Sequence, residues 1–113
     1  MPERRDIYTA IIYYRGQSGA SKPRPVVILN ELENNFVTIA EITSVPPKKN
    51  PGFYDKFKGE IVNWEKCGLA EPSWVKCFKE NTHNVNIGRL HDKIGVMDSQ
   101  DFENAVMNMY YNN

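Results

Sequence analysis

The sequence has no long hydrophobic run, no excess of charge of one sign and very little cysteine or histidine. Its first apolar segment, IYTAIIYY, spans eight residues with a polar interruption, which is too short for a signal peptide or a membrane span. Fourteen Lys and Arg residues balance fourteen Asp and Glu residues, so the chain lacks the net positive charge typical of non-specific nucleic-acid binders. Any anion-binding site must therefore be local.

The chain has only two cysteines, Cys67 and Cys77, and in the absence of an export signal we expect reduced thiols and a cytoplasmic protein. With His83 and His91 they leave gaps of nine, five and seven residues, unlike the close ligand pairs of structural zinc sites. Neither cysteine lies in the electropositive setting of a catalytic thiol. The sequence also lacks a Gly-x-Gly-x-x-Gly loop, a Walker loop and a Gly-x-Ser-x-Gly elbow. We therefore expect neither a metal nor a cofactor.

What is present is the composition of one globular domain spanning residues 1–113, with 41% hydrophobic and 25% charged residues. Residues 6–14 have strand propensity and are followed by a Gly/Ser-rich loop. The run VVIL (26–29) has no polar alternate position, which indicates a strand covered on both faces. After a polar turn, the alternating segment FVTIAEIT (36–43) predicts an antiparallel third strand and hence a meander.

The second half predicts shorter strands and one helix. Residues 44–60 hold three prolines, two glycines and four lysines, which is typical of a long, partly basic loop. EIVNW (60–64) and PSWVKCF (72–78) predict two further strands. Near the end, Asp98 or Ser99 can cap a helix, and its predicted apolar face consists of Phe102, Ala105, Val106, Met109 and Tyr110. The fold class is therefore mainly β (α+β).

Arg24 stands out because it lies between Pro23 and Pro25 at the start of the buried second strand. Each proline restricts its own backbone and that of the residue before it, so Arg24 is held unusually rigidly. In the third strand, the period of two places Glu41 and Thr43 on the same face.

Several other cations and hydroxyls lie at predicted loops and strand ends. They are Lys22, Ser44, Lys48, Lys49 and Lys76, and together with Arg24 and Thr43 they form one candidate set. Arginine offers a planar fork of donors to phosphate oxygens, and lysines add point charges. From the residues alone, the set is either an anion site or an ordinary solvated surface.

The order of these segments resembles the MazF/PemK/Kid family of toxin endoribonucleases over nearly the full length. The segments are RRDIYTAIIYY, KPRPVVIL, AEITSVPP, SWVKCF and NIGRLHDKIGVMDSQDFENAV. The most specific are the R-P step that opens an aliphatic strand, the I-T-S step that closes the next strand, and the K-I-G segment before the last helix. The resemblance implies an SH3-like antiparallel β-barrel with a C-terminal helix. It also implies a homodimer, metal-independent cleavage of single-stranded RNA, and a cognate antitoxin as protein partner.

Carried over by position, the resemblance implies that Arg24 and Thr43 are the catalytic residues. The ribose 2′-hydroxyl of the RNA would attack the adjacent phosphate, while Arg24 stabilises the developing charge and Thr43 hydrogen-bonds a phosphate oxygen. The residues expected to bind RNA are Ser21, Lys22, Ser44, Lys48, Lys49 and Lys76. Some members carry Arg and Asp where this chain has Lys76 and Phe78, and Glu41 is then the candidate substitute for the missing carboxylate.

Two alternatives from other functional classes stay open. The chain could be a non-catalytic poison like the related CcdB-type toxins, which share the fold and bind a topoisomerase. It could also be an inactive SH3-like interaction module that has kept only the scaffold. The R-P and I-T-S segments argue against the first alternative, because binding to a protein partner requires neither segment.

Overall fold

A computed structural model describes residues 1–12 and 23–113 of the chain. The strands in these ranges are β1 (Asp6–Ala10), β2 (Arg24–Glu31), β3 (Phe36–Thr43), β4 (Lys58–Glu60), β5 (Trp74–Lys76), β6 (Thr82–Asn86) and β7 (Leu90–Val96). Three short 3-10 turns are η1 (Phe53–Phe57), η2 (Lys79–Asn81) and η3 (Ile87–Arg89), and the α-helix is α1 (Ser99–Asn112). Within the described ranges, no helix has the length and apolar character needed to cross a membrane.

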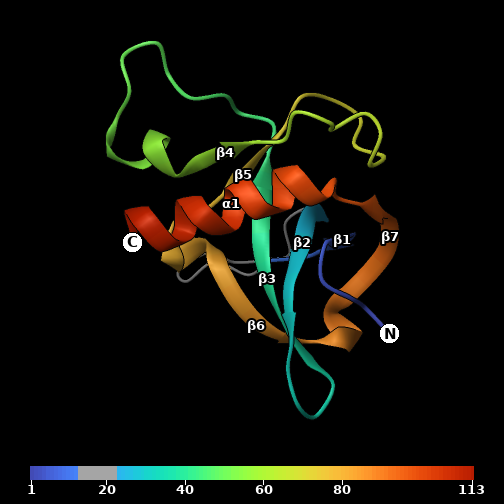
Figure 1. Ribbon diagram of the computed structural model, residues 1–113. Coiled ribbons are helices and arrows are strands. Elements are labelled where there is room, and N and C mark those ends of the chain that lie inside the picture. The colour runs from blue at the N-terminus through green and yellow to red at the C-terminus, as the bar shows by residue number, and fades with distance from the viewer. Residues whose placement is uncertain (13–22) are drawn as a thin grey trace.

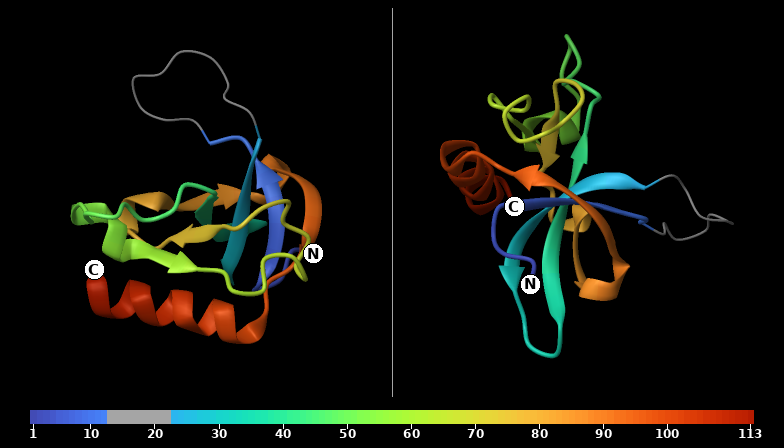
Figure 2. Two further views of the ribbon diagram at one scale, coloured as in Figure 1. Left: turned by 90° about the horizontal axis from the view of Figure 1, so that it is seen from above. Right: turned by 90° about the vertical axis from the view of Figure 1, so that its right-hand side faces the viewer.

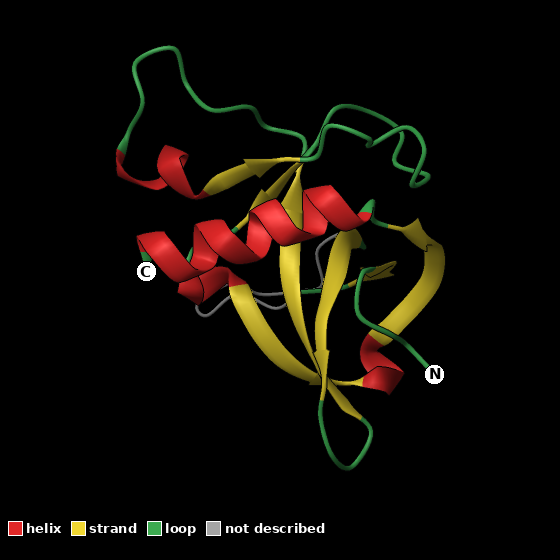
Figure 3. Cartoon of the chain, viewed as in Figure 1, coloured by secondary structure: helices red, strands yellow, loops and turns green. Residues whose placement is uncertain are grey.

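The strands form one antiparallel, strongly curved sheet in the order β4-β5-β3-β2-β1-β7, with β6 also paired to β3 (Figures 1 and 3). The predicted mainly-β class with a C-terminal helix is confirmed, and so is the meander of the first three strands. Among the described residues, β4, β6 and β7 each pair with a single neighbouring strand and form the edges of the sheet. The sheet therefore bends without closing into a full barrel.

Apolar clusters lie on both faces of the sheet. One cluster lies under α1 and includes Val27, Ala40 and Ile42, and Figure 2 shows the helix along this face. The other cluster lies on the opposite face and includes Val26 and Ile28. The prediction that the second strand is covered on both faces is therefore confirmed. The predicted alternation in β3 also holds, because its odd-numbered residues point away from the helix.

The C-terminal helix begins where the sequence predicts. Asp98 is its N-cap, and its carboxylate accepts hydrogen bonds from the backbone N–H groups of Gln100 and Asp101. Phe102 and Ala105 are buried, and the next apolar positions of that face pack against the same cluster. Tyr110 was wrongly assigned to this face, because it lies at the last turn and is 77% exposed.

The predicted strand EIVNW does not form beyond Glu60, because residues 62–68 make turns. The backbone N–H groups of Val62 and Asn63 donate to the buried carboxylate of Asp101, at 3.2 and 2.9 Å, and not to a neighbouring strand. The backbone then closes on itself through a hydrogen bond from Cys67 N to Asn63 O. The Asp101 side chain of the helix therefore accepts the hydrogen bonds that these N–H groups would donate to a neighbouring strand if the segment were extended.

Other predicted boundaries shift as well. The first strand ends at Ala10, and the predicted residues 13 and 14 lie outside the described part of the chain. The expected loop 44–60 ends in ordered structure, since η1 and β4 occupy residues 53–60. The last two strands, β6 and β7, were not predicted, because neither shows the apolar alternation of a half-buried strand.

Candidate nucleic-acid interface

Arg24 and Thr43 meet at one end of the sheet. Arg24 opens β2 opposite Ala10 of β1, and Thr43 closes β3. The β2–β3 register pairs Val26 with Glu41, so the same register continued by two residues places Arg24 opposite Thr43. Both line a cavity of about 340 Å³, here called the Arg24 cavity, together with Ser44. The two residues of the predicted catalytic pair are therefore neighbours at this end of the sheet.

The Thr43 hydroxyl is fixed by the backbone that follows it. Its Oγ1 accepts a hydrogen bond from the N–H of Val45 at 3.1 Å. Because that bond uses an acceptor site of the oxygen, the hydroxyl proton can still be donated to a ligand. Arg24 itself is exposed to solvent, as a residue that binds an anion must be.

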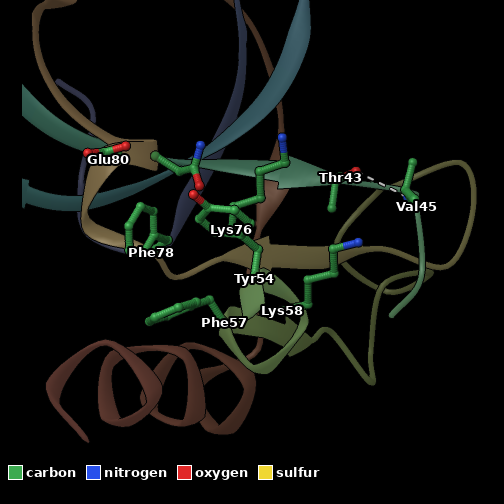
Figure 4. Close-up of a pocket in the computed structure, with 9 residues that line it drawn as sticks. Thr43, Val45, Tyr54, Phe57, Lys58, Lys76, Phe78 and Glu80 are labelled. Carbon is green, nitrogen blue, oxygen red and sulfur yellow. Dashed lines mark hydrogen bonds between the residues drawn. The ribbon is translucent and has the colours of Figure 1, made fainter. Parts of the chain in front are cut away.

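A second cavity lies on the other side of Thr43 and has a volume of about 460 Å³ (Figure 4). It is here called the aromatic cavity, and its lining includes Thr43, Lys58, Lys76, Tyr54, Phe57 and Phe78. Lys58 and Lys76 lie opposite each other in the β4–β5 register, so their side chains share one face. Thr43 thus separates a cavity that contains an arginine from one that contains two lysines.

The two lysines of the aromatic cavity are held by different carboxylates. Lys58 Nζ lies 3.4 Å from Asp55 Oδ1 and donates to the carbonyl oxygen of Pro46 at 3.3 Å. A hydrogen bond from the Gly52 N–H and the nearby Lys58 lower the pKa of Asp55 below its ordinary value, so this carboxylate stays charged. Lys76 Nζ lies 3.9 Å from Glu41 Oε1.

Glu41 is a buried carboxylate at the point where β3 changes its partner. Its neighbour Ala40 pairs with β6, whereas its neighbour Ile42 pairs with β5. The Glu41 side chain is 4% exposed, and its Oε2 lies 2.7 Å from His83 Nε2. The sequence offers no carboxylate next to Lys76 within its own strand, β5. Glu41 of the neighbouring strand β3 supplies one. This buried carboxylate is paired with Lys76 and lies within hydrogen-bond distance of His83, and both partners are partly exposed.

The remaining predicted residues divide into three groups. Ser44 and Lys76 line the cavities that flank Thr43. Lys48 and Lys49 are exposed on the segment after β3 and line neither cavity. Ser21 and Lys22 lie outside the described residues.

Sequence reasoning missed three contributors to this surface: Lys58, His83 and the aromatic residues of η1. Lys58 could have been paired with Lys76 only from the β4–β5 register, and His83 with Glu41 only from the β3–β6 register. The aromatic residues were visible as the segment FYDKF inside an otherwise polar loop.

The two cysteines are free thiols and are buried in the core under the helix. Burial raises the pKa of Cys77 to about 12, and burial also raises the pKa of Cys67. Both therefore act as small apolar core residues and not as nucleophiles. Over residues 1–12 and 23–113, no three His, Cys, Asp or Glu side chains are grouped closely enough to hold a metal ion.

Solved structures with a similar fold include bacterial toxins and endoribonucleases. The Mycobacterium tuberculosis toxin MazF-mt6 is 22% identical and superposes with a TM-score of 0.68, over 96% of this chain and 95% of that chain. An endoribonuclease in complex with its cognate antitoxin, from a mycobacterial species, is 14% identical with a TM-score of 0.68, over 96% and 91%. MazF from Deinococcus radiodurans is 11% identical with a TM-score of 0.62, over 96% and 92%. These similarities define the fold class as that of MazF.

Residues 3–108 match the model of the PemK-like, MazF-like toxins of type II toxin–antitoxin systems. The match covers most of the chain, so the chain belongs to this family. No curated protein sequence matches the chain at a significant level.

Proposed function

We propose that this chain is an endoribonuclease toxin that cleaves single-stranded RNA at the junction of the Arg24 cavity and the aromatic cavity. The observation that carries the proposal is the position of Thr43 in the lining of both cavities, with Arg24 on one side and Lys76 on the other. A phosphodiester at Thr43 would have cationic donors on both sides. Family membership and the endoribonucleases among the structural neighbours support the same reaction class.

In the proposed reaction the nucleophile belongs to the substrate. The ribose 2′-oxygen forms a bond to the adjacent phosphorus, and the bond from phosphorus to the 5′-oxygen of the next nucleotide breaks. The 2′-hydroxyl loses its proton as its oxygen bonds to phosphorus, and the departing 5′-oxygen gains one, so the products are a 2′,3′-cyclic phosphate and a free 5′-hydroxyl with no water or protein atom added. Bound RNA holds this hydroxyl next to the phosphorus, which removes much of the entropic barrier.

The protein then has to stabilise charge and hold the phosphate in position. Arg24 would donate to the oxygens that gain charge in the transition state, and its rigid backbone keeps the guanidinium oriented before the substrate arrives. Thr43 would donate its hydroxyl proton to a phosphate oxygen. Lys76, held by Glu41, would supply positive charge from the opposite side. These side chains provide the positive charge that phosphoryl transfer requires, so we expect the reaction to be independent of a metal ion.

We further propose a homodimer that is neutralised by a cognate antitoxin. One small domain offers little concave surface for an extended RNA strand, so a groove across a dimer interface would supply the missing wall. One structural neighbour was solved with its cognate antitoxin, which supports a similar partner here. An acidic, flexible antitoxin tail would compete with RNA for the exposed lysines, such as Lys48. Light scattering at micromolar concentration tests the dimer, and a strictly monomeric mass would contradict it.

The test of the chemistry is the nature of the cut. Purified protein is incubated with a long single-stranded RNA in EDTA, and the cleavage positions are mapped. A synthetic substrate with one 2′-deoxyribose on the 5′ side of the cut should bind nearly as well as RNA but should not be cleaved, because only one hydroxyl is removed. A 5′-phosphate product, or cleavage of the deoxy substrate, would show that water is the nucleophile. No cleavage of any RNA would favour a poison or an inactive scaffold.

A further inference from the structure

Four aromatic rings form a continuous wall beside the lysines of the aromatic cavity. The ring of Phe78 lies 4.8 Å from Phe57 and 5.2 Å from Tyr54, and the rings of Phe53 and Tyr54 are 5.0 Å apart, all in tilted or edge-to-face geometry. Figure 4 shows Tyr54, Phe57 and Phe78 on the side of the cavity that faces away from Thr43. This set of rings is here called the aromatic wall.

The outer part of the wall is exposed although it is rigidly held. Phe53 and Tyr54 are 62% and 61% exposed, whereas Phe57 is buried in the core and anchors the same short turn. Asp55 fixes this turn through the Gly52 N–H at 2.7 Å and through Lys58 at 3.4 Å. Rings that are held in place and left in solvent form a contiguous apolar patch, which marks a binding surface.

The chemistry around the wall favours a nucleobase over an apolar protein side chain. Lys58 and Lys76 line the same cavity, and Lys56 Nζ lies 4.9 Å from the centre of the Phe53 ring. Aromatic rings beside cations are the arrangement by which proteins hold single-stranded nucleic acid, because each base stacks while its phosphate meets positive charge. A cavity of about 460 Å³ has the size of a small-ligand site.

The position of the wall links it to the proposed cleavage site. Thr43 lines both cavities, so a strand whose phosphate lies at Thr43 and Arg24 has an adjacent nucleotide over the aromatic cavity. We propose that the aromatic wall is a stacking site for one nucleobase of the bound RNA, next to the cleaved phosphate. This inference rests on the proposed RNA-cleaving function. It adds that the wall contributes to affinity and to the choice of base at one position of the cleaved sequence.

The test compares Tyr54→Ala with Tyr54→Phe and with Tyr110→Ala. Tyr110 is a matched control, because it is also exposed and in edge-to-face contact with another tyrosine, Tyr111, but lies on the helix. Binding is measured by fluorescence polarisation with 2′-O-methyl oligonucleotides of A, C or U, which lack the attacking hydroxyl. Cleavage preference is measured by sequencing the ends made in a long RNA.

We expect Tyr54→Ala to weaken binding by about tenfold or more, which is the effect of losing one stacked base. We expect Tyr54→Phe and Tyr110→Ala to bind like the wild type, and Tyr54→Ala to lose base preference at one position near the cut. Because Tyr54 is exposed, the melting temperature of the Tyr54→Ala variant should equal that of the wild type. If Tyr54→Ala keeps wild-type affinity and preference while the wild type cleaves RNA, the wall serves another partner and the inference is wrong. If the wild type neither binds nor cleaves RNA, the proposed function fails as well.

Discussion

Replacing Glu41 with glutamine should weaken both the fold and the proposed site. The substitution keeps the size of the side chain and removes its charge. In the wild type the Glu41 carboxylate lies 2.7 Å from His83 Nε2 and 3.9 Å from Lys76 Nζ, and the residue is 3% exposed. At the 3.9 Å separation of Glu41 and Lys76, a carboxylate and an ammonium attract by about 4 kcal/mol at an effective dielectric constant near 20.

Only part of this attraction contributes to stability. Lys76 and His83 are both partly exposed and gain water when the carboxylate is lost, and burial of the carboxylate itself has a cost. The net contribution should therefore be that of hydrogen bonds to a charged group, about 1.5–3 kcal/mol. In a domain of this size each kcal/mol changes the melting temperature by about 4–8 °C. Thermal unfolding of Glu41→Gln should thus begin several degrees lower.

The same change should reduce RNA cleavage, because Lys76 loses the group that holds it at the aromatic cavity. Poor positioning of one group near the reacting atoms can lower a rate by about a hundredfold, and we expect a loss of at least tenfold. Glu33→Gln is the matched control, since Glu33 is exposed in the turn between β2 and β3. If Glu41→Gln melts and cleaves like Glu33→Gln, the Glu41 carboxylate neither stabilises the sheet nor orders the site.

Three further predictions concern buried or charged groups outside the proposed cleavage residues. Neither cysteine should react with Ellman's reagent at pH 8 until urea is added, because both thiols are buried and the pKa of Cys77 is raised to about 12; rapid labelling of folded protein would contradict this. The pKa of Asp55 is lower in the folded than in the unfolded chain, so its stabilising effect is present at neutral pH and is lost as the pH falls through the folded value. Wild type and Asp55→Asn should therefore differ in melting temperature at pH 7 and converge in acid; a constant difference would refute this reasoning. Asp101→Ala should lower the free energy of unfolding by about 2–3 kcal/mol in urea titrations, because it leaves two backbone N–H groups without their acceptor, and an unchanged midpoint would show that water replaces the carboxylate.

Local patterns predicted the elements whose hydrogen bonds and burial depend on neighbours in sequence. The apolar run that starts at Val26 and the alternation through Thr43 led to the correct strands, and Asp98 to the correct helix start. The segment EIVNW failed because Asp101, far along the chain, captures its backbone donors. Propensity cannot show such a contact.

The same distinction applies to the candidate site. Arg24 and Thr43 were identified from short motifs in adjacent strands, so their proximity follows from the meander. The contact between Glu41 and His83 depends on the register of β6, whose polar sequence gives no strand signal. The aromatic wall depends on how η1 folds back onto Phe78, which no local pattern encodes.

The most direct test of the account is the rate at which Arg24→Ala cleaves single-stranded RNA in EDTA. Lys66→Ala provides the control, because Lys66 is an exposed cation in the turn after β4 and lines neither cavity. We expect Arg24→Ala to lose about 10²–10³ in rate with an unchanged melting temperature, and Thr43→Ala to lose less. Lys66→Ala should cleave like the wild type. Wild-type cleavage by a correctly folded Arg24→Ala variant would contradict the assignment of this site.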